Sequence, residues 1–376
     1  MNRRAGLVLT TIAEPAVLEE YYDNFKAHDH LEQVKVYVIP DRKTPAGAFD
    51  RCAEFRKRSL QVVFPDFNEQ ECYLRKVGFP PELIPYNSDN RRNIGYLMAL
   101  SDGNDFVISL DDDNYCAGEG DVFADYEMVC DGAAEHPVVE SESGWFNICS
   151  LMEICPDVEA YARGFPYFAR HKEPKVRETP RKVRVRVNAG LWLSEPDMDG
   201  ISWLVNPVRT ESFKGRSLVL GKRAWSPINT QNTSLHRDVL AAYYFIRMGY
   251  PLSGFAIDRY GDIFSGYFSQ ACVHHLGDRI RVGTPVAIHR RNSHNYMRDA
   301  ANEMGCIWML EDLLQWLPEQ KLQGKSYGEA YISLSHLLEE ASFHFQGPIW
   351  TDAARGFLSQ MGFCMRKWAE TCRKIG

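Results

Sequence analysis

Three consecutive aspartates, Asp111, Asp112 and Asp113, directly follow an apolar run at 106–110. A buried strand that ends in carboxylates presents them at the carboxyl edge of its sheet, where open α/β sheets bind ligands. Three adjacent like charges repel each other, so we expect a cation to neutralise them. Mg2+ and Mn2+ prefer oxygen ligands, so a divalent cation that carries a diphosphate suits this position. The alternative is an acidic turn after a strand.

The first third of the chain alternates strand and helix patterns, which predicts a parallel sheet with helices on its faces. A nucleotide would then lie over the strand ends, in contact with Thr11 and Asp41 as well as Asp111. The strands are expected at 5–12, 34–39 and 105–110, and the helices at 15–27, 48–60 and 94–100.

The two common glycine-rich phosphate-binding motifs are absent from the sequence. No GxGxxG follows the first strand, and no GxxxxGK[ST] occurs anywhere. Neither the dinucleotide fingerprint nor the P-loop is therefore available. We expect a metal and arginines to hold the phosphates, and no flavin.

Composition narrows the class of protein. The chain has 376 residues, 45% of them hydrophobic, with a net charge of -7, which argues against a nucleic-acid binder. No stretch approaches the roughly 18 apolar residues of a membrane span. The ten cysteines form no CxxC pair and are expected to be reduced core thiols. These features predict a cytoplasmic protein without a membrane span.

Two segments in the second half carry distinctive patterns. Residues 181–187 alternate basic and apolar side chains, which predicts a half-buried strand. Its basic face is either that of a solvated edge strand or a cationic wall near a diphosphate. Residues 240–249 have a helical pattern.

The last 70 or so residues read as helices, at 306–317, 327–345 and 353–372. In the last helix one face carries Phe357, Met361, Met365, Trp368 and Cys372. We therefore divide the chain into a catalytic domain at 1–305 and a helical region at 306–376. The helices would pack on the α/β body or on another subunit, which makes a homo-oligomer one interpretation.

Other residues with suitable chemistry lie outside the aspartate triplet. Arg163 and Arg170 flank a segment with Pro166, which forbids a continuous helix, so both project from a turn. His289 follows an apolar run, so it lies at a strand end, where it either completes a metal site or is structural. Asp262 lies in a polar loop and either binds sugar hydroxyls, acts as a base or merely belongs to a turn.

Taken together and in order, these motifs resemble those of the reversibly glycosylated polypeptides, which are the plant UDP-arabinopyranose mutases and their relatives. The resemblance runs from the first strand to about Leu317. The segments that carry it are Asn93-Ile94-Gly95-Tyr96-Leu97, Ser109-Leu110-Asp111-Asp112-Asp113, Arg163-Gly164-Phe165-Pro166, Gly190-Leu191-Trp192-Leu193-Ser194-Glu195-Pro196-Asp197, Arg259-Tyr260-Gly261-Asp262 and His289.

The resemblance implies a GT-A-like (Rossmann-like) α/β fold for nucleotide-sugar binding, to which the helical pattern of the last 70 or so residues adds a C-terminal helical extension. It implies a metal-dependent, flavin-independent enzyme that interconverts the pyranose and furanose forms of a nucleotide-bound sugar. Family members also glycosylate themselves on an arginine, which Arg163 matches, and need a second arginine, which Arg170 matches. Arg92 matches a further arginine of the family. Trp192 and Asp197 are expected to bind the sugar.

The sequence departs from the plant pattern in two places. Gly261 stands where the plant loop has an aspartate, and Pro40-Asp41-Arg42 replaces a Gln-Asp-Gly-Asp segment. Both lie where base or sugar should bind, so we predict a different sugar nucleotide. Bacterial mutases that resemble this family act on GDP-hexoses in nucleoside-antibiotic pathways, so GDP-L-galactose is the expected substrate, with a UDP-arabinose-type sugar as the alternative.

The predicted roles follow from this resemblance and from the residue chemistry. A metal (Mn2+ or Mg2+) held by Asp111, Asp113 and His289 would carry the diphosphate. Arg92 and Arg170 would bind its oxygens, and Asp112 or Asp262 would move protons. Arg163 would either attack the sugar or orient it. The rival functions are a glycosyltransferase with a separate acceptor and a non-catalytic scaffold subunit.

Overall fold

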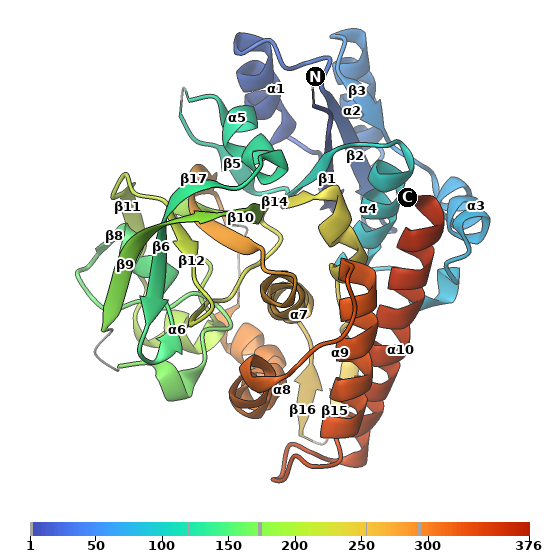
Figure 1. The fold of residues 1–376 in the computed structure, drawn as a ribbon. Coiled ribbons are helices and arrows are strands. Elements are labelled where there is room, and N and C mark those ends of the chain that lie inside the picture. The colour runs from blue at the N-terminus through green and yellow to red at the C-terminus, as the bar shows by residue number, and fades with distance from the viewer. Residues whose placement is uncertain (1–2, 119, 172–174, 253, 292–294) are drawn as a thin grey trace.

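The computed structural model describes residues 3–118, 120–171, 175–252, 254–291 and 295–376. Its amino-terminal half is built on four parallel strands in the order β3-β2-β1-β4 (Figure 1). The strands are β1 (Ala5–Thr11), β2 (Val34–Pro40), β3 (Gln61–Val63) and β4 (Phe106–Leu110). The helices between them are α1 (Leu18–Ala27), α2 (Gly47–Lys57), α3 (Phe67–Val77) and α4 (Arg92–Ser101). The predicted α/β class, with parallel strands and helices on both faces, is therefore confirmed.

The same sheet continues beyond β4 in mixed orientation. Next to β4 lies β14 (Asn232–His236), antiparallel to it, followed by β10 (Val185–Ser194) and β17 (Arg279–His289), which run parallel to each other. The sheet then passes through β12 (Leu218–Leu220) and β6 (Ala134–Ser141) to β9 (Val176–Val183). Smaller strands complete the fold: β5 (Asn114–Cys116), β7 (Gly144–Trp145), β8 (Met152–Cys155), β11 (Arg209–Phe213), β13 (Ala224–Trp225), β15 (Tyr250–Leu252) and β16 (Phe255–Ile257).

One short strand connects the two halves of the sheet at the site. Strand β5 begins directly after the aspartate triplet and pairs antiparallel with the end of β17, so that Asn114 lies opposite His289. The carboxyl end of β4 and the carboxyl end of β17 are thereby held side by side. Residues more than 170 positions apart in the chain become neighbours through this pairing.

Alternate residues of the parallel strands enter two different cores. Leu7 and Leu9 of β1 pack with α1, α2 and α5 (Val122–Glu127), whereas Val8 packs in the larger core on the other face. This is the period of two that a strand covered on both faces requires. The larger core also takes in α4, α7 (Gly261–His275) and the three last helices.

The C-terminal helices are confirmed, as α8 (Tyr296–Trp316), α9 (Tyr327–Ala341) and α10 (Asp352–Ile375). The predicted stripe on α10 is buried within the chain itself, among residues of the larger core. Trp368 is wholly buried and its indole N–H donates to the Leu240 carbonyl at 2.6 Å. Residue 306, the predicted start of a separate helical region, lies inside α8, and the division remains a prediction.

The basic alternating segment at 181–187 is not one strand as predicted: 181–183 end the edge strand β9, and 185–187 begin β10 inside the sheet. Strand β9 is the last strand of the order, and Arg184 separates it from β10. Arg184 pairs with Asp278 at 2.5 Å, and Arg186 donates to the Val129 carbonyl. None of these residues lines the cavity described below, so the structure favours the edge-strand interpretation over a cationic wall.

The helix expected at 240–249 is wrong. A 3-10 helix, η6 (Arg237–Ala242), ends early, and the chain then enters the core without regular structure. Asn93 of α4 explains this path because its side chain accepts from the Phe245 N–H and donates to the Phe245 carbonyl, each at 2.9 Å. A side-chain amide thus satisfies the backbone groups that a helix would have paired.

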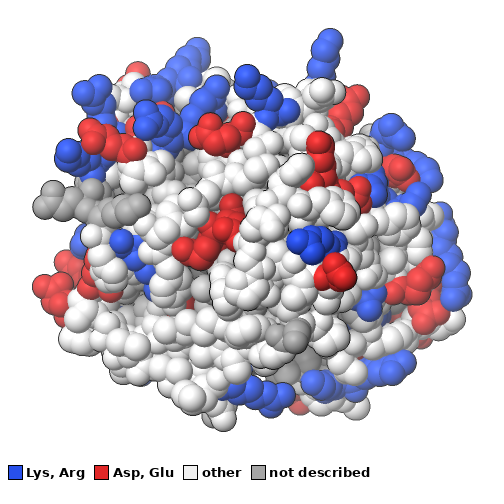
Figure 2. Space-filling model, turned by 90° about the horizontal axis from the view of Figure 1, so that it is seen from below, with Lys and Arg blue, Asp and Glu red and all other residues white. Residues whose placement is uncertain are grey.

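The surface shows no large area of one charge on the face seen in Figure 2. Acidic side chains lie near the middle of this face, and lysines and arginines lie mainly toward its margin. Within the described parts of the chain, no helix is long and apolar enough to cross a membrane.

Replacing Trp368 by alanine tests whether α10 belongs to the core. We expect the free energy of unfolding to fall by about 3–5 kcal/mol, because the substitution leaves a large cavity and an unpaired carbonyl. The matched control is Phe363→Ala on the same helix, where the side chain is 43% exposed and the change should stay near 0.5 kcal/mol. Urea unfolding measures both, and equal losses would contradict this role of α10.

Candidate active site

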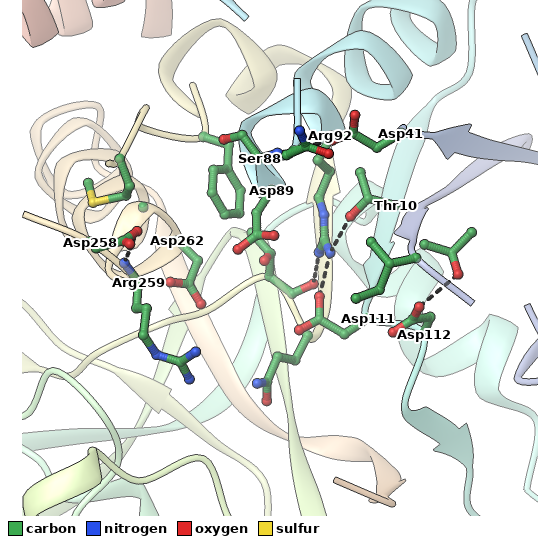
Figure 3. A pocket seen from close by; sticks show the side chains of 18 of the residues that line it. Thr10, Asp41, Ser88, Asp89, Arg92, Asp111, Asp112, Asp258, Arg259 and Asp262 are labelled. Atoms are coloured by element: carbon green, nitrogen blue, oxygen red, sulfur yellow. Dashed lines mark hydrogen bonds and ion pairs between the residues drawn. The ribbon is translucent and has the colours of Figure 1, made fainter. Parts of the chain in front are cut away.

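A cavity of about 590 Å³ lies at the carboxyl ends of β1, β2 and β4 and extends to the start of α7. Figure 3 shows Asp262, Asp258 and Arg259 on one side of it, Arg92 with Asp111 on the other, and Asp89 between them. Its charged lining comprises Asp41, Asp89, Asp111, Asp112, Asp113, Asp197, Asp258 and Asp262 with Lys43, Arg92, Arg163, Arg247, Arg259 and Arg291.

Most residues predicted for the site line this one cavity: Thr11, Asp41, Arg92, Asp111, Asp112, Asp113, Arg163, Asp197, Asp262 and His289. Two do not. Trp192 points from β10 into the larger core and is 3% exposed. Arg170 lines a separate, smaller hollow beside α6 (Gly200–Val205). The structure therefore gives neither residue a place beside a ligand in the cavity.

The ends of β1 and β4 are tied together by a hydroxyl and a carboxylate. Thr11 lies 2.7 Å from Asp112 Oδ2 and the same distance from the Ala13 carbonyl. Strand β4 stops at Leu110, and the chain turns so that the Asn114 N–H donates to the Asp111 carbonyl. In this turn the three carboxylates take three different partners.

Arg92, the first residue of α4, lies behind the triplet. Its Nη2 is 2.5 Å from Asp111 Oδ1, and its Nη1 donates to Ser109 Oγ and the Thr230 carbonyl. The guanidinium is buried, with a side chain only 4% exposed. Burial raises the pKa of Asp111 to about 6, although the charge of Arg92 opposes the rise. Arg92 is thus committed to the triplet and to the strand that carries it.

Asp113 faces His289 across the junction that β5 creates. The distance between Asp113 Oδ2 and His289 Nε2 is 3.4 Å, and His289 Nδ1 lies 2.6 Å from the Glu195 carbonyl. Burial opposes ionisation, but the bond and charge of His289 outweigh it and hold the pKa of Asp113 below its usual value. Burial likewise disfavours the imidazolium, yet Asp113 raises the pKa of His289.

This pair suits a cation. Because a carbonyl can only accept, His289 must carry a proton on Nδ1, so its Nε2 directs a lone pair at Asp113 whenever the ring is neutral. Two acceptors then face each other, and either a proton or a metal ion resolves the conflict. Asp111 is turned toward Arg92 instead, and no three acidic, histidine or cysteine residues in the described parts of the chain are disposed to hold a metal. The predicted three-residue set is therefore reduced to Asp113 and His289, with ligand oxygens needed to complete it.

Arg163 is clamped between two carboxylates on the opposite side of the cavity. Its Nε and Nη2 donate to Asp197 at 2.9 and 3.1 Å. Its Nη1 and Nη2 donate to Asp262 at 3.1 and 2.6 Å, and Nη1 also reaches the Arg259 carbonyl at 2.5 Å. All five N–H donors of the guanidinium are therefore used.

The clamp fixes the charge of all its members. Burial alone would lower the pKa of Arg163, but Asp197 and Asp262 outweigh it and raise that pKa well above its usual value. Burial would raise the pKa of Asp197, and Arg163 holds it below its usual value instead. The three side chains are buried, with Arg163 7%, Asp197 3% and Asp262 6% exposed. Two carboxylates and one cation leave one negative charge in a largely dry place.

Arg170 supports the clamp from outside the cavity. It donates to Asp199 at 2.7 Å and stacks on Tyr167, with 3.7 Å from the guanidinium carbon to the ring centre. Asp199 in turn caps α6 by accepting from the Ser202 N–H. Because Asp197 and Asp199 lie two residues apart, the Arg163 and Arg170 ion pairs fasten the same two segments together. The predicted contact of Arg170 with a diphosphate finds no support in this geometry.

Glu303 of α8 holds both sides of the clamp in position. This carboxylate is wholly buried and accepts from the Gly200 N–H at 2.7 Å and from Arg259 Nε at 3.1 Å. Gly200 belongs to the segment that carries Asp197, and Arg259 to the one that carries Asp262. Arg259 has a φ of 62°, a left-handed conformation that is costly for a residue with a Cβ, and this conformation presents its carbonyl to Arg163.

Asp41 organises the loops beyond β2. Its carboxylate accepts from the Arg42 N–H at 2.7 Å and from the Ser88 N–H at 3.0 Å. It is 7% exposed but still lines the cavity, together with Lys43 and Tyr86. The end of β2 and the segment before α4 are thus locked into one wall.

Gly261 marks a local difference from the plant pattern. A Cβ at this position would lie 2.4 Å from the Ile246 carbonyl and 2.6 Å from the Phe245 ring. The irregular segment after η6 therefore occupies the space that an aspartate would need.

Several residues of the site were not predicted from sequence, among them Phe245, Arg291 and Glu303. Arg291 follows His289 by two positions, so its place at the strand end was available as a signal. Phe245 lay in a segment assigned to a helix. Glu303 gave no signal, because a glutamate in a helix is normally solvated.

Replacing Arg163 by methionine should destabilise the protein by about 3–5 kcal/mol, because two buried carboxylates would lose their shared cation. Their pKa values would then rise above the unfolded value of about 4, and the folded state would bind more protons than the unfolded state. The lost stability should therefore return in part as the pH falls from 7 to 5. Urea unfolding at the two pH values measures this.

In the wild-type protein, stability changes with pH in the opposite direction. The lowered pKa of Asp197 gives stability that is present above the unfolded pKa and lost only as the pH falls through the lower folded value. The variant Asp262→Asn keeps one carboxylate on Arg163 and should show a smaller loss than Arg163→Met. A loss in Arg163→Met that is the same at pH 7 and pH 5 would contradict the charge assignment.

Solved structures resemble the chain only coarsely. A mannosyltransferase from Pyrobaculum calidifontis in complex with GDP-Man and Mn2+ aligns with a TM-score of 0.39 and 10% identity, over 99% of this chain and 74% of that one. Glucosyl-3-phosphoglycerate synthase from Mycobacterium tuberculosis, with Mg2+ and UDP, gives 0.40 and 13% over 82% and 79%. At these scores the likeness carries no argument about the site.

Sequence relatives are more informative. Probable UDP-arabinopyranose mutase 4 of Arabidopsis thaliana is 23% identical over 75% of this chain and 74% of its own. UDP-arabinopyranose mutase 3 of the same plant is 24% identical over 86% and 89%, and a probable UDP-arabinopyranose mutase 1 of Zea mays is 28% identical over 74% and 73%. The sequence model of the reversibly glycosylated polypeptides matches residues 67–372. The chain therefore belongs to the reversibly glycosylated polypeptide family.

Proposed function

We propose that this protein is a mutase that interconverts the pyranose and furanose forms of a nucleotide-linked sugar. The observation that carries the proposal is that one cavity joins the strand-end aspartates to the buried clamp around Arg163. The strand-end aspartates can hold a nucleotide diphosphate through a cation, and the clamp can face its sugar. Family membership and the printed activity of the relatives support the same conclusion.

The charge of the cavity favours a substrate that arrives with a divalent cation. Eight aspartates and six lysines or arginines line it, so the lining is acidic even before a diphosphate enters. Asp113 and His289 would hold Mn2+ or Mg2+, together with oxygens of the substrate. When bound, such a cation would stabilise the diphosphate as a leaving group.

The protein side of the reaction follows from the positions of the carboxylates. In the proposed reaction the C1–O bond to the diphosphate breaks, the 4-hydroxyl of the sugar closes onto C1, the old ring oxygen leaves C1, and the diphosphate returns. One proton moves from the 4-hydroxyl to the former ring oxygen, so the mass is unchanged. Asp262 lines the cavity on the clamp side, and we assign this proton transfer to it. Asp112 is tied to Thr11 at the nucleotide side.

Arg163 could either orient the sugar or attack it covalently, and the clamp affects both routes. Held by two carboxylates, it is a cation that orients the sugar and is not a nucleophile in this arrangement. A covalent route needs a proton to move from Nη2 to Asp262 Oδ2 along the 2.6 Å bond before the nitrogen attacks C1. Single-turnover mass spectrometry of the intact protein distinguishes the two routes. An adduct on Arg163 that forms and decays at the turnover rate supports the covalent route.

The identity of the nucleotide sugar is a separate, more specific proposal. The relatives reported above carry UDP-arabinopyranose in their names, so UDP-arabinose-type sugars come first. The predicted GDP-hexose, such as GDP-L-galactose, rests on Gly261 and Pro40-Asp41-Arg42 alone. Both classes belong in the same assay.

The test is incubation of purified, flavin-free protein with Mn2+ and a panel of UDP- and GDP-sugars. Chromatography should show a new isomer of unchanged mass without any acceptor, and EDTA should abolish it. Asp113→Asn should lower kcat/KM by roughly 100-fold or more, because it removes one side of the cation site. Asp238→Asn is the control, since that side chain lies outside the cavity and is 63% exposed.

Hydrolysis without isomerisation across the whole panel would contradict the mutase and favour a glycosyltransferase that lacks its acceptor. Full activity in Asp113→Asn would contradict the cation site while leaving the mutase in place.

A further inference from the structure

The cavity lining leaves few cations free for a diphosphate. Arg92 is paired with Asp111, Arg163 with Asp197 and Asp262, and Arg259 with Asp299 and Glu303. Of the cavity-lining cations that the structure describes, Lys43, Arg247 and Arg291 form no ion pair with a described carboxylate. These three are therefore the unpaired cationic side chains that a bound diphosphate could contact, in addition to a divalent cation at Asp113 and His289.

Arg291 is the one of the three that lies next to both parts of the site in the fold. It follows His289 at the end of β17, and β17 runs beside β10, so that Ser194 pairs with His289 and the chain continues from there to Asp197. Burial and Arg163 are the main influences on the pKa of Asp197, and Arg291 adds to its lowering. Arg291 thus lines the cavity two residues after His289 and is near enough to Asp197 of the clamp to affect its pKa.

The side chain of Arg291 is held in place and yet unsatisfied. Its guanidinium lies over the rings of Trp203 and Tyr296, at 5.2 and 5.4 Å from their centres, and these two rings stack on each other. Its Nη1 is buried and has no hydrogen-bond partner among the residues that the structure describes. A buried N–H without an acceptor costs free energy, so a group that lines a ligand cavity in this state is prepared for an acceptor from the ligand.

Lys43 and Arg247 are less suited to this role. Lys43 follows the end of β2, on the wall that Asp41 organises. Arg247 lies over the ring of Tyr250, at the start of β15. Neither is next to the Asp113–His289 pair in the sheet.

We infer that Arg291 binds the terminal phosphate of the substrate diphosphate, the one attached to the sugar. A guanidinium can donate two parallel bonds to phosphate oxygens and keeps its charge at all working pH values. There it would bind the diphosphate both before and after the C1–O bond breaks and keep it in place to return. This inference rests on the proposed nucleotide-sugar site and names one of its contacts.

The experiment compares nucleoside diphosphate with nucleoside monophosphate binding. Dissociation constants of UDP, UMP, GDP and GMP are measured by calorimetry in the presence of Mn2+, for wild type and for Arg291→Gln. In wild type the diphosphate of the preferred base should bind at least about 10-fold more tightly than its monophosphate, a difference typical of charge-assisted contacts. In Arg291→Gln this ratio should fall to about 2 or less, with monophosphate binding nearly unchanged.

The ratio separates a direct contact from general damage, because a distorted site would weaken both nucleotides together. Arg291→Lys keeps the charge without the fork and should give an intermediate ratio. Arg290→Gln is the matched control, since the adjacent arginine pairs with Glu20, stacks on Tyr115 and is absent from the cavity lining. It should leave the ratio at the wild-type value.

An Arg291→Gln protein that keeps the wild-type ratio overturns the inference, and so does one that loses both affinities equally. Should that variant not fold, a wild-type ratio in Arg291→Lys overturns it as well. Failure of the proposed function looks different, because wild type would then bind nucleoside diphosphates without isomerising any sugar in the panel.

Discussion

The candidate site depends on one guanidinium held between two buried carboxylates. Arg163 uses every N–H donor it has, on Asp197, Asp262 and the Arg259 carbonyl. Such an arrangement is costly to desolvate unless all its members are paired, so the surrounding chain has to hold them closely. Gly200, Arg259 and Glu303 do so from α6, the loop before α7 and α8. Helix α8 therefore reaches the site through two buried carboxylates, Asp299 and Glu303, which both pair with Arg259.

The second constraint is the excess of negative charge in the cavity. Asp111 is balanced by Arg92 and Asp197 by Arg163, while Asp113 faces an imidazole that shares its need for a proton or a cation. An acidic cavity that binds a diphosphate must obtain cations from somewhere. A divalent ion that replaces the proton between Asp113 and His289, with Arg291 on the same strand end, would meet that requirement while the ion pairs of Arg92 and Arg163 stay intact.

The sequence predicted those site residues whose position depends on the local order of strands and helices along the chain. Asp111, Asp112 and Asp113 end an apolar run, so their place at a strand end, together with Thr11 and Asp41, follows from the βαβ pattern alone. Family resemblance added Arg92, Arg163 and Asp197. The pairing of Arg163 with Asp197 and Asp262 was not predicted, because these residues lie 34 and 99 positions apart and meet through loops, for which periodicity gives no signal. Asn93 redirected residues 243–249 from the expected helix for the same reason: a single long-range side-chain contact outweighed local propensity.

Arg170 and Trp192 show the limit of transferring roles by motif. Both occur in matching segments, yet one holds the cap of α6 from outside the cavity and the other fills the core. A residue can therefore be needed by a family because it supports the residue that acts. The supporting role of Arg170 follows from its contacts in the folded chain, and its position in the sequence does not reveal it.

In the proposed reaction, the bond between the sugar and the diphosphate breaks and re-forms in this cavity. Positional isotope exchange tests it most directly. A nucleotide sugar carrying 18O in the oxygen between C1 and phosphorus is incubated with the protein and followed by 31P NMR. The account predicts that the label spreads to the non-bridging oxygens of that phosphate at least as fast as the furanose appears. Furanose formed with the label still wholly in the bridging position would contradict it, since the ring would then have changed without departure of the diphosphate.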